Sequence, residues 1–216
     1  MFENIPVEVG LVHEGERVRK NDMQVELGGP QEPEKFEIVR VRPADAVEDG
    51  KILINGPDIA DMAEGKHYPL GIVVEISGAR LEPDLEGVVE RRIHEYCNYI
   101  EGFMHLNQRY DIWIRVSKKA FKKGLTSLRF IGEVMIDLFR KELPLIEKIQ
   151  VTFIMDPAAI KPLFEEAMKT YEARDARARG LSDDDVDVFY GCALCQSFAP
   201  THVCVITPQR YANCGA

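Results

Sequence analysis

The chain has 216 residues, of which 45% are hydrophobic and 29% are charged, and its formal net charge is −9. A chain of this length can bury a sizeable core without cross-links, and its acidic balance argues against a general nucleic-acid binder. No apolar run approaches the roughly 20 residues that span a bilayer, and the first residues do not resemble a secretion signal. We therefore expect a cytoplasmic protein with neither a membrane nor a nucleic-acid partner.

Strands and turns are predicted over the first 80 residues. Apolar and polar residues alternate over residues 35–42, 51–55 and 70–77, and a period of two is typical of a half-buried strand. Pairs such as Gly56-Pro57 punctuate these runs as turns. This part of the chain is therefore expected to supply most of a sheet.

Helices alternate with strands further along the chain. A helix is predicted over residues 83–104, with Pro83 in its first turn and apolar residues at helical spacing. A strand over 111–117, a helix over 127–142, a strand over 149–155 and a helix beginning at Asp156 follow. This order predicts an α+β fold in two layers, in which helices pack on one face of a mostly antiparallel sheet.

Two further expectations concern Cys97 and Gly180. Cys97 lies in the apolar stripe of the helix predicted over 83–104, so we expect a buried packing thiol rather than a fifth metal ligand. Gly180 can end the last helix, so residues 1–180 are expected to form the α+β domain and residues 181–216 a short cysteine-rich segment. Ser182 can cap a short helix in that segment, which would deliver Cys192 and Cys195 about one turn apart.

The remaining four cysteines gather near the end of the chain, at positions 192, 195, 204 and 214, with the spacing C-x2-C-x8-C-x9-C. Soft thiolates gathered this closely usually hold zinc or an iron–sulfur cluster. The spacing matches neither the common ferredoxin patterns nor the two short pairs of a structural zinc site, so both metals stay open. A redox pair of Cys192 and Cys195 lacks the usual βαβ context, and mere packing is disfavoured by four thiols within 23 residues.

The sequence around these cysteines resembles the metal-binding segment of acetyl-CoA synthase. The similarity is greater to the beta subunit of the archaeal acetyl-CoA decarbonylase/synthase complex, and it extends over essentially the whole chain. It rests on Phe189-Tyr190-Gly191-Cys192, Cys195-Gln196-Ser197-Phe198-Ala199-Pro200, His202-Val203-Cys204, Thr207-Pro208 and Cys214-Gly215, and on upstream residues 87–95, 102–109, 112–117 and 171–187.

The resemblance implies a [4Fe–4S] cluster joined through a cysteine sulfur to a two-nickel site. By position, Cys192, Cys204 and Cys214 match the cysteines that bind only the cluster, and Cys195 matches the one that also bridges to the proximal nickel. Phe198 matches an aromatic residue that walls the nickel site. His202 matches a histidine near the cluster.

The same resemblance implies an acetyltransferase activity and a set of partners. Members of the family join CO with a methyl group from a corrinoid iron–sulfur protein and transfer the acetyl product to coenzyme A. CO dehydrogenase subunits, the corrinoid protein and ferredoxin are the implied partners.

The sequence departs from the family pattern in one respect. In the family a later Cys-Gly-Cys holds the distal nickel, whereas this sequence reaches Ala216 before such an element. The resemblance therefore implies a truncated form that has no synthase activity by itself. The alternative is a standalone zinc or iron–sulfur module that docks coenzyme A or a redox partner.

A basic cluster around Trp113 is the candidate site for coenzyme A. Arg109, Arg115, Lys118 and Lys119 lie close to this tryptophan in the sequence. Guanidinium groups pair well with phosphate, and an indole can stack on a base. The family's middle domain is similar, with arginines near a tryptophan, but an ordinary solvated basic face is an equal alternative.

Overall fold

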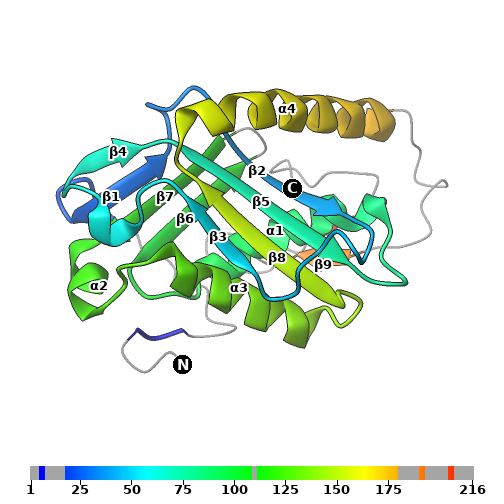
Figure 1. Cartoon of the computed structure of the whole chain (residues 1–216), viewed down its shortest axis with the longest axis horizontal. Helices are drawn as coiled ribbons and strands as arrows, with labels where there is room; N and C mark the ends of the chain where they lie inside the picture. The colour runs from blue at the N-terminus through cyan, green and yellow to red at the C-terminus, as the bar shows by residue number, and fades with distance from the viewer. Residues whose placement is uncertain (1–4, 8–17, 109–110, 180–189, 193–203, 207–216) are drawn as a thin grey trace.

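Two four-stranded sheets organise the part of the chain that the structure describes (Figure 1). The structure is a computed structural model, and it describes residues 5–7, 18–108, 111–179, 190–192 and 204–206. The helices are α1 (Glu86–Cys97), α2 (Lys118–Lys123), α3 (Leu128–Glu142) and α4 (Pro157–Arg179), with short 3-10 turns at Ile59–Asp61 and Pro83–Leu85. The strands are β1 (Met23–Gly28), β2 (Lys35–Val41), β3 (Ile52–Asn55), β4 (Lys66–Tyr68), β5 (Leu70–Ser77), β6 (Phe103–Gln108), β7 (Asp111–Ser117), β8 (Lys148–Ile154), β9 (Tyr190–Cys192) and β10 (Cys204–Ile206).

Both large sheets are mixed. The first has the order β4-β1-β7-β6, with β1 parallel to β4 and antiparallel to β7, and β7 antiparallel to β6. The second has the order β2-β5-β8-β3, in which β5 and β8 are antiparallel while both outer strands run parallel to their neighbours. The predicted α+β class is confirmed, although the strands form two mixed sheets rather than one mostly antiparallel sheet.

The main core lies between the inner faces of the two sheets and the helices α1 and α3. Inward residues at a period of two, such as Leu27 of β1, Ile114 of β7 and Ile72 of β5, are fully or almost fully buried. α3 follows the N-cap Ser127, whose hydroxyl accepts a hydrogen bond from the Arg129 N–H at 3.0 Å. The helix predicted over 127–142 is therefore confirmed, with its start set by this cap.

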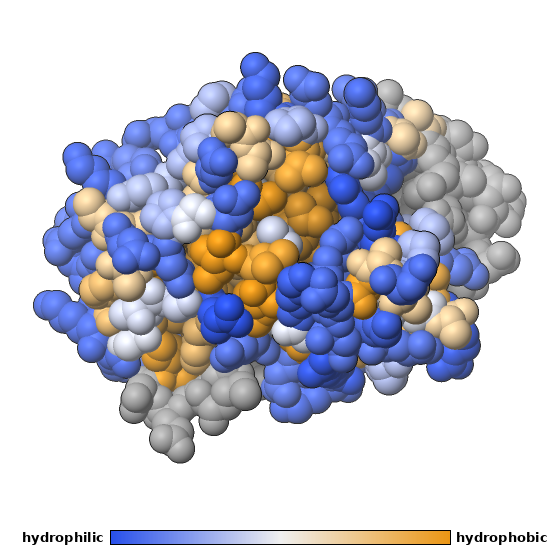
Figure 2. All heavy atoms as spheres, in the orientation of Figure 1, coloured by the Kyte–Doolittle hydropathy of each residue, from blue (hydrophilic) through white to orange (hydrophobic). Residues whose placement is uncertain are grey.

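α4 covers the opposite face of the second sheet and so adds a third layer to the two that were predicted. Phe36 and Ile38 of β2 point away from the main core and pack with Ile160 and Ala167 of α4. This layer forms because β2 carries apolar side chains on both of its faces, which both need cover. Figure 2 shows hydrophobic side chains gathered over the second sheet beside α4.

The helix predicted over residues 83–104 ends at Cys97, earlier than expected, and strand β6 follows. Asn98 ends the helix: its amide donates to the carbonyls of His94 (2.7 Å) and His105 (2.9 Å), and its oxygen accepts from the His105 N–H (3.1 Å). Gly102 then reverses the chain at φ 76°, where a Cβ would lie 2.6 Å from the Cβ of Ala120. The apolar residues beyond Cys97 therefore belong to a turn and a strand.

Candidate functional site

The short strands β9 and β10 bring two of the four predicted metal ligands to neighbouring positions. The strands pair antiparallel, and the register places Cys204 directly opposite Cys192. Directly opposed residues of such a pair have Cα atoms about 4.5–5.5 Å apart. The backbone register thus brings positions 192 and 204 together, and the shared metal centre stays a prediction.

Cys192 ends a strand, whereas a helix was expected to deliver it. Cys195, Cys214, Phe198 and His202 lie outside the described residues, as does the helix expected after Ser182. Elsewhere, over the residues whose side chains the structure describes, no group of three or more His, Cys, Asp or Glu residues could hold a metal ion.

The prediction for Cys97 is confirmed. Its side chain is 1% exposed and belongs to the main core. Burial raises the pKa of the Cys97 thiol well above its ordinary value, and the nearby charge of Glu37 adds to the effect. A thiol that resists ionisation in this way is a poor metal ligand.

The outer face of the first sheet carries the Trp113 site. A row of directly opposed residues crosses all four strands: His67 of β4, Glu26 of β1, Arg115 of β7 and Met104 of β6. In the next row Trp113 of β7 lies between Gly28 of β1 and Leu106 of β6. Leu106 is 44% exposed, so an apolar side chain beside the indole is open to solvent.

Trp113 and Arg115 are brought together as predicted, and Arg109 lies outside the described residues. The guanidinium carbon of Arg115 lies 4.6 Å from the centre of the indole. Gly29 has φ 79°, and a Cβ there would come within 2.8 Å of the indole, so only glycine leaves room for this ring position.

Arg115 is held in place by groups of the protein itself. Its Nε donates to the Glu26 carboxylate, and its Nη1 donates to the Val18 carbonyl at 3.0 Å. Burial opposes ionisation of Glu26, but hydrogen bonding and the charges of Arg115 and His67 outweigh it and lower the pKa of this carboxyl group. The arginine therefore presents a fixed plane over the indole, with one of its two terminal nitrogens already used.

The lysines that follow β7 are paired with acidic side chains. Lys118 lies 2.7 Å from Glu64, and Lys119 and Lys123 lie 2.6 and 2.8 Å from the two oxygens of Glu101. Exposed pairs of this kind exchange readily with solvent and ligands because each contributes little stability. Acidic side chains thus neutralise part of the positive charge of the lysines near Trp113.

A buried polar cluster that was not predicted from the sequence lies between β2, α1 and β6. Glu37 is fully buried; its carboxylate contacts His105 Nε2 at 2.8 Å and accepts a hydrogen bond from the Asn107 amide. Nδ1 of His105 lies 3.3 Å from Nδ1 of His94, so one of these two nitrogens must carry the hydrogen. Burial, followed by the charges of His105 and Arg91, holds the pKa of His94 well below its ordinary value, so His94 is neutral at neutral pH.

One signal in the sequence could have identified this cluster. Glu37 shares the inward face of β2 with Val39 and Val41, at a period of two. A carboxylate on an otherwise aliphatic strand face requires buried hydrogen-bond partners.

Two family descriptions match this chain, and both refer to the same class of protein. Residues 5–160 match the family described as CO dehydrogenase/acetyl-CoA synthase complex beta subunit, and residues 171–216 match the family that describes the C-terminal part of the ACS/CODH beta subunit. The first match covers more than half of the chain, so the chain belongs to the family of CO dehydrogenase/acetyl-CoA synthase complex beta subunits.

Several curated relatives to which the chain is similar come from archaea. The chain is 55% identical over 216 residues to the acetyl-CoA decarbonylase/synthase complex subunit beta of Methanothermobacter thermautotrophicus, covering 100% of this chain and 46% of that protein. It is 54% identical to subunit beta 2 of Methanosarcina thermophila and 56% identical to subunit beta 2 of Methanocaldococcus jannaschii, in each case covering 100% of this chain and 45% of the relative. The chain thus spans about half the length of the curated relatives it matches.

None of the helices in the described part of the chain has the length and apolar character that crossing a bilayer requires.

Proposed function

We propose that this chain contributes to the synthesis or cleavage of acetyl-CoA from CO, a corrinoid-borne methyl group and coenzyme A. The proposal is supported by membership of the family and, above all, by the register that sets Cys204 opposite Cys192. A nickel–iron–sulfur centre supplies soft, sulfur-ligated metal suited to CO and methyl chemistry when it is bound.

The cysteines have separate roles in this proposal. Cys192, Cys204 and Cys214 would hold a [4Fe–4S] cluster, and Cys195 would hold the cluster and the adjoining nickel. Phe198 would wall the nickel site and His202 would lie near the cluster. CO dehydrogenase subunits, the corrinoid iron–sulfur protein and ferredoxin are the proposed partners, in the cytoplasm.

Metal analysis after anaerobic purification tests the cysteine roles. We expect about four iron atoms and as much acid-labile sulfide per chain, and a loss of both in Cys192→Ser and Cys204→Ser. Cys97→Ser is the matched control, because Cys97 is buried in the core and should leave the iron content unchanged. One zinc ion per chain without sulfide would instead favour the alternative, a standalone zinc module that docks coenzyme A or a redox partner.

We further propose that coenzyme A binds on the Trp113 face. The adenine would stack on the indole beside exposed Leu106, while Arg115, fixed by Glu26, supports the ring from its other side. The phosphates would displace the acidic partners of Lys118 and Lys119 and bind these two lysines in their place. They would also pair with Arg109.

Fluorescence tests this site directly, because Trp113 is the single tryptophan of the chain. Coenzyme A should change its emission in a saturable manner, and Leu106→Ala should weaken binding several-fold. Leu53→Ala is the matched control: Leu53 is 42% exposed but lies on β3 of the other sheet, so its truncation should leave binding unchanged. Emission that does not respond to coenzyme A, or equal effects of the two truncations, would remove the proposal.

A further inference from the structure

One buried carboxylate joins the polar side chains on the outer face of the first sheet. Glu26 of β1 is 2% exposed, and its partners come from the strands on both sides of it, β4 and β7 (Figure 1). Its Oε1 lies 2.5 Å from His67 Nδ1, and its Oε2 accepts a hydrogen bond from Arg115 Nε. Both oxygens of the carboxylate are therefore engaged by groups of the protein.

Trp113 is tied to the same carboxylate in two ways. Arg115, whose Nε binds Glu26, lies with its guanidinium carbon 4.6 Å from the centre of the indole. The indole N–H also acts on the carboxylate: burial raises the pKa of Glu26, but Arg115 and Trp113 more than offset burial, and the pKa is lowered. Loss of the carboxylate would thus release both the guanidinium and the indole.

Glu26 also limits what Arg115 can bind. It supplies a negative charge beside the guanidinium, and the Val18 carbonyl accepts from Nη1 at 3.0 Å. An arginine paired in this way attracts phosphate less than an unpaired one, whereas its flat face stays suited to stacking. The position beside Trp113 therefore favours an uncharged planar ring over an anion.

We propose that Glu26 is a positioning residue that determines specificity: by fixing Arg115 and Trp113 it makes their face select an uncharged heteroaromatic ring, such as adenine, over a phosphate group. The proposal rests on the proposed binding of coenzyme A to the Trp113 face. Side chains that are ordered before the ligand arrives save the cost of ordering them on binding. Glu26 should therefore contribute to affinity without touching the ligand.

Glu26→Gln tests the proposal on the full chain, because glutamine keeps the shape of the side chain but removes its charge. Without ligand, the anisotropy decay of Trp113, the single tryptophan, should gain a larger fast component. Coenzyme A, followed through Trp113 emission, should bind about tenfold more weakly, the change that the loss of one charge-assisted hydrogen bond gives. Inorganic pyrophosphate should bind at least as well as it binds to the wild type.

Glu75→Gln is the matched control. Glu75 also pairs with an arginine, Arg42 at 3.3 Å, but it lies on β5 of the other sheet. Its substitution should leave the anisotropy decay unchanged and alter the affinity for coenzyme A less than about twofold.

A double-mutant cycle separates positioning from a general loss of structure. If Glu26 acts through Arg115, Glu26→Gln should cost no further affinity for coenzyme A once Arg115→Gln is present. Losses that add overturn the proposal. So does a Glu26→Gln chain that loses pyrophosphate as strongly as it loses coenzyme A.

The remaining outcomes distinguish this proposal from the coenzyme A proposal on which it rests. Should Glu26→Gln not fold, Glu26→Asp takes its place, since it keeps the charge but shortens the reach toward Arg115; unchanged anisotropy and affinity in that variant overturn the proposal. Wild-type emission that does not respond to coenzyme A defeats the proposed coenzyme A function instead. The anisotropy decay of the free protein alone then decides whether Glu26 fixes the indole of Trp113.

Discussion

Burial sets the protonation of Glu90, which lies between α1, β2 and α4. Desolvation raises the pKa of its carboxyl group to about 7, although the charge and hydrogen bonds of Arg174 and the Val39 N–H oppose the shift, and the charge of Glu37 reinforces it. Glu86 on the same helix also accepts a hydrogen bond from Arg174, so Glu90 is one of two acidic partners of the arginine. A single carboxyl group thus titrates near neutrality inside the contact that holds α4.

Glu90→Gln should therefore change how stability depends on pH. The folded-state pKa of about 7 lies above the ordinary value of 4.5, so the folded state holds the proton more tightly than the unfolded chain. The resulting stabilisation is complete below pH 4.5 and is lost as pH rises through about 7. Glutamine does not titrate. As pH rises from about 5 to 8, the free energy of unfolding of the wild type should therefore fall by up to about 3 kcal/mol relative to that of the variant.

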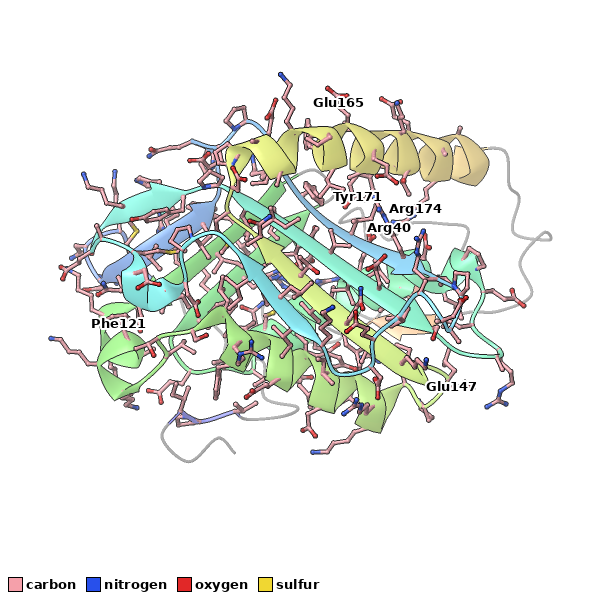
Figure 3. The ribbon with its side chains drawn as sticks, in the orientation of Figure 1. Arg40, Phe121, Glu147, Glu165, Tyr171 and Arg174 are labelled. Carbon is pink, nitrogen blue, oxygen red and sulfur yellow. The ribbon has the colours of Figure 1, made fainter. Side chains whose placement is uncertain are left out.

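Urea unfolding at several pH values measures this difference. Glu165→Gln serves as the control, since Glu165 is exposed on the outer side of α4 (Figure 3) and its curve should run parallel to wild type. A constant difference between Glu90→Gln and wild type across the range would contradict the titration of Glu90.

At the scale of elements, boundaries are decided by single polar side chains rather than by apolar spacing. The stripe that predicted a helix over 83–104 continues past Cys97, yet the helix ends there because Asn98 binds the carbonyls of His94 and His105. The same amide aligns the start of β6, so one residue sets the end of one element and the position of the next.

Asn98→Ala should lower the free energy of unfolding by about 2–3 kcal/mol, since it leaves backbone groups beside His105 without partners. Asn98→Asp is the informative companion, because it keeps the acceptor for the His105 N–H but loses both donated hydrogen bonds. In thermal unfolding the wild type should have the highest midpoint, followed by Asn98→Asp and then by Asn98→Ala. Equal midpoints for all three proteins would show that Asn98 does not determine this boundary.

The sequence was sufficient to predict a strand or helix wherever a local pattern of residues determined the local structure. Alternation found β2, β5, β7 and β8, and apolar residues at helical spacing located α3. It was insufficient where distant residues surround a side chain. Glu37 alone does not identify its partner His105, which is 68 residues away in the sequence. The row of residues from His67 to Met104 exists only once four strands have paired. The metal site was predicted from spacing and resemblance, and the register of Cys192 and Cys204 supplies the geometric support that spacing lacks.

At the scale of the molecule, α4 contains the end of the first family match and the start of the second. The first family match ends at residue 160, but Ile160, Ala167 and Tyr171 cover the outer face of the second sheet. The structural unit therefore extends through α4, which agrees with a boundary at Gly180, a division that remains a prediction.

Two truncations distinguish these boundaries. A chain of residues 1–179 retains Arg174 and the whole of α4, so it should unfold cooperatively with a midpoint close to that of the full chain. A chain of residues 1–160 would expose Phe36, Ile38 and Val73, and it should aggregate or unfold at least about 10 °C lower. Calorimetry measures the unfolding midpoints and size-exclusion chromatography measures aggregation. If both fragments are equally stable, the domain boundary lies at residue 160.

The opposition of Cys192 and Cys204 also governs how the protein must be handled. Antiparallel partners have Cα atoms about 4.5–5.5 Å apart, which lies within the roughly 4.4–6.8 Å that a disulfide spans. Dioxygen can therefore turn these two thiols into a cystine, which offers no thiolate to any metal. A preparation made in air would keep its folded body yet take up neither iron, nickel nor zinc at this pair until a reductant reopened it.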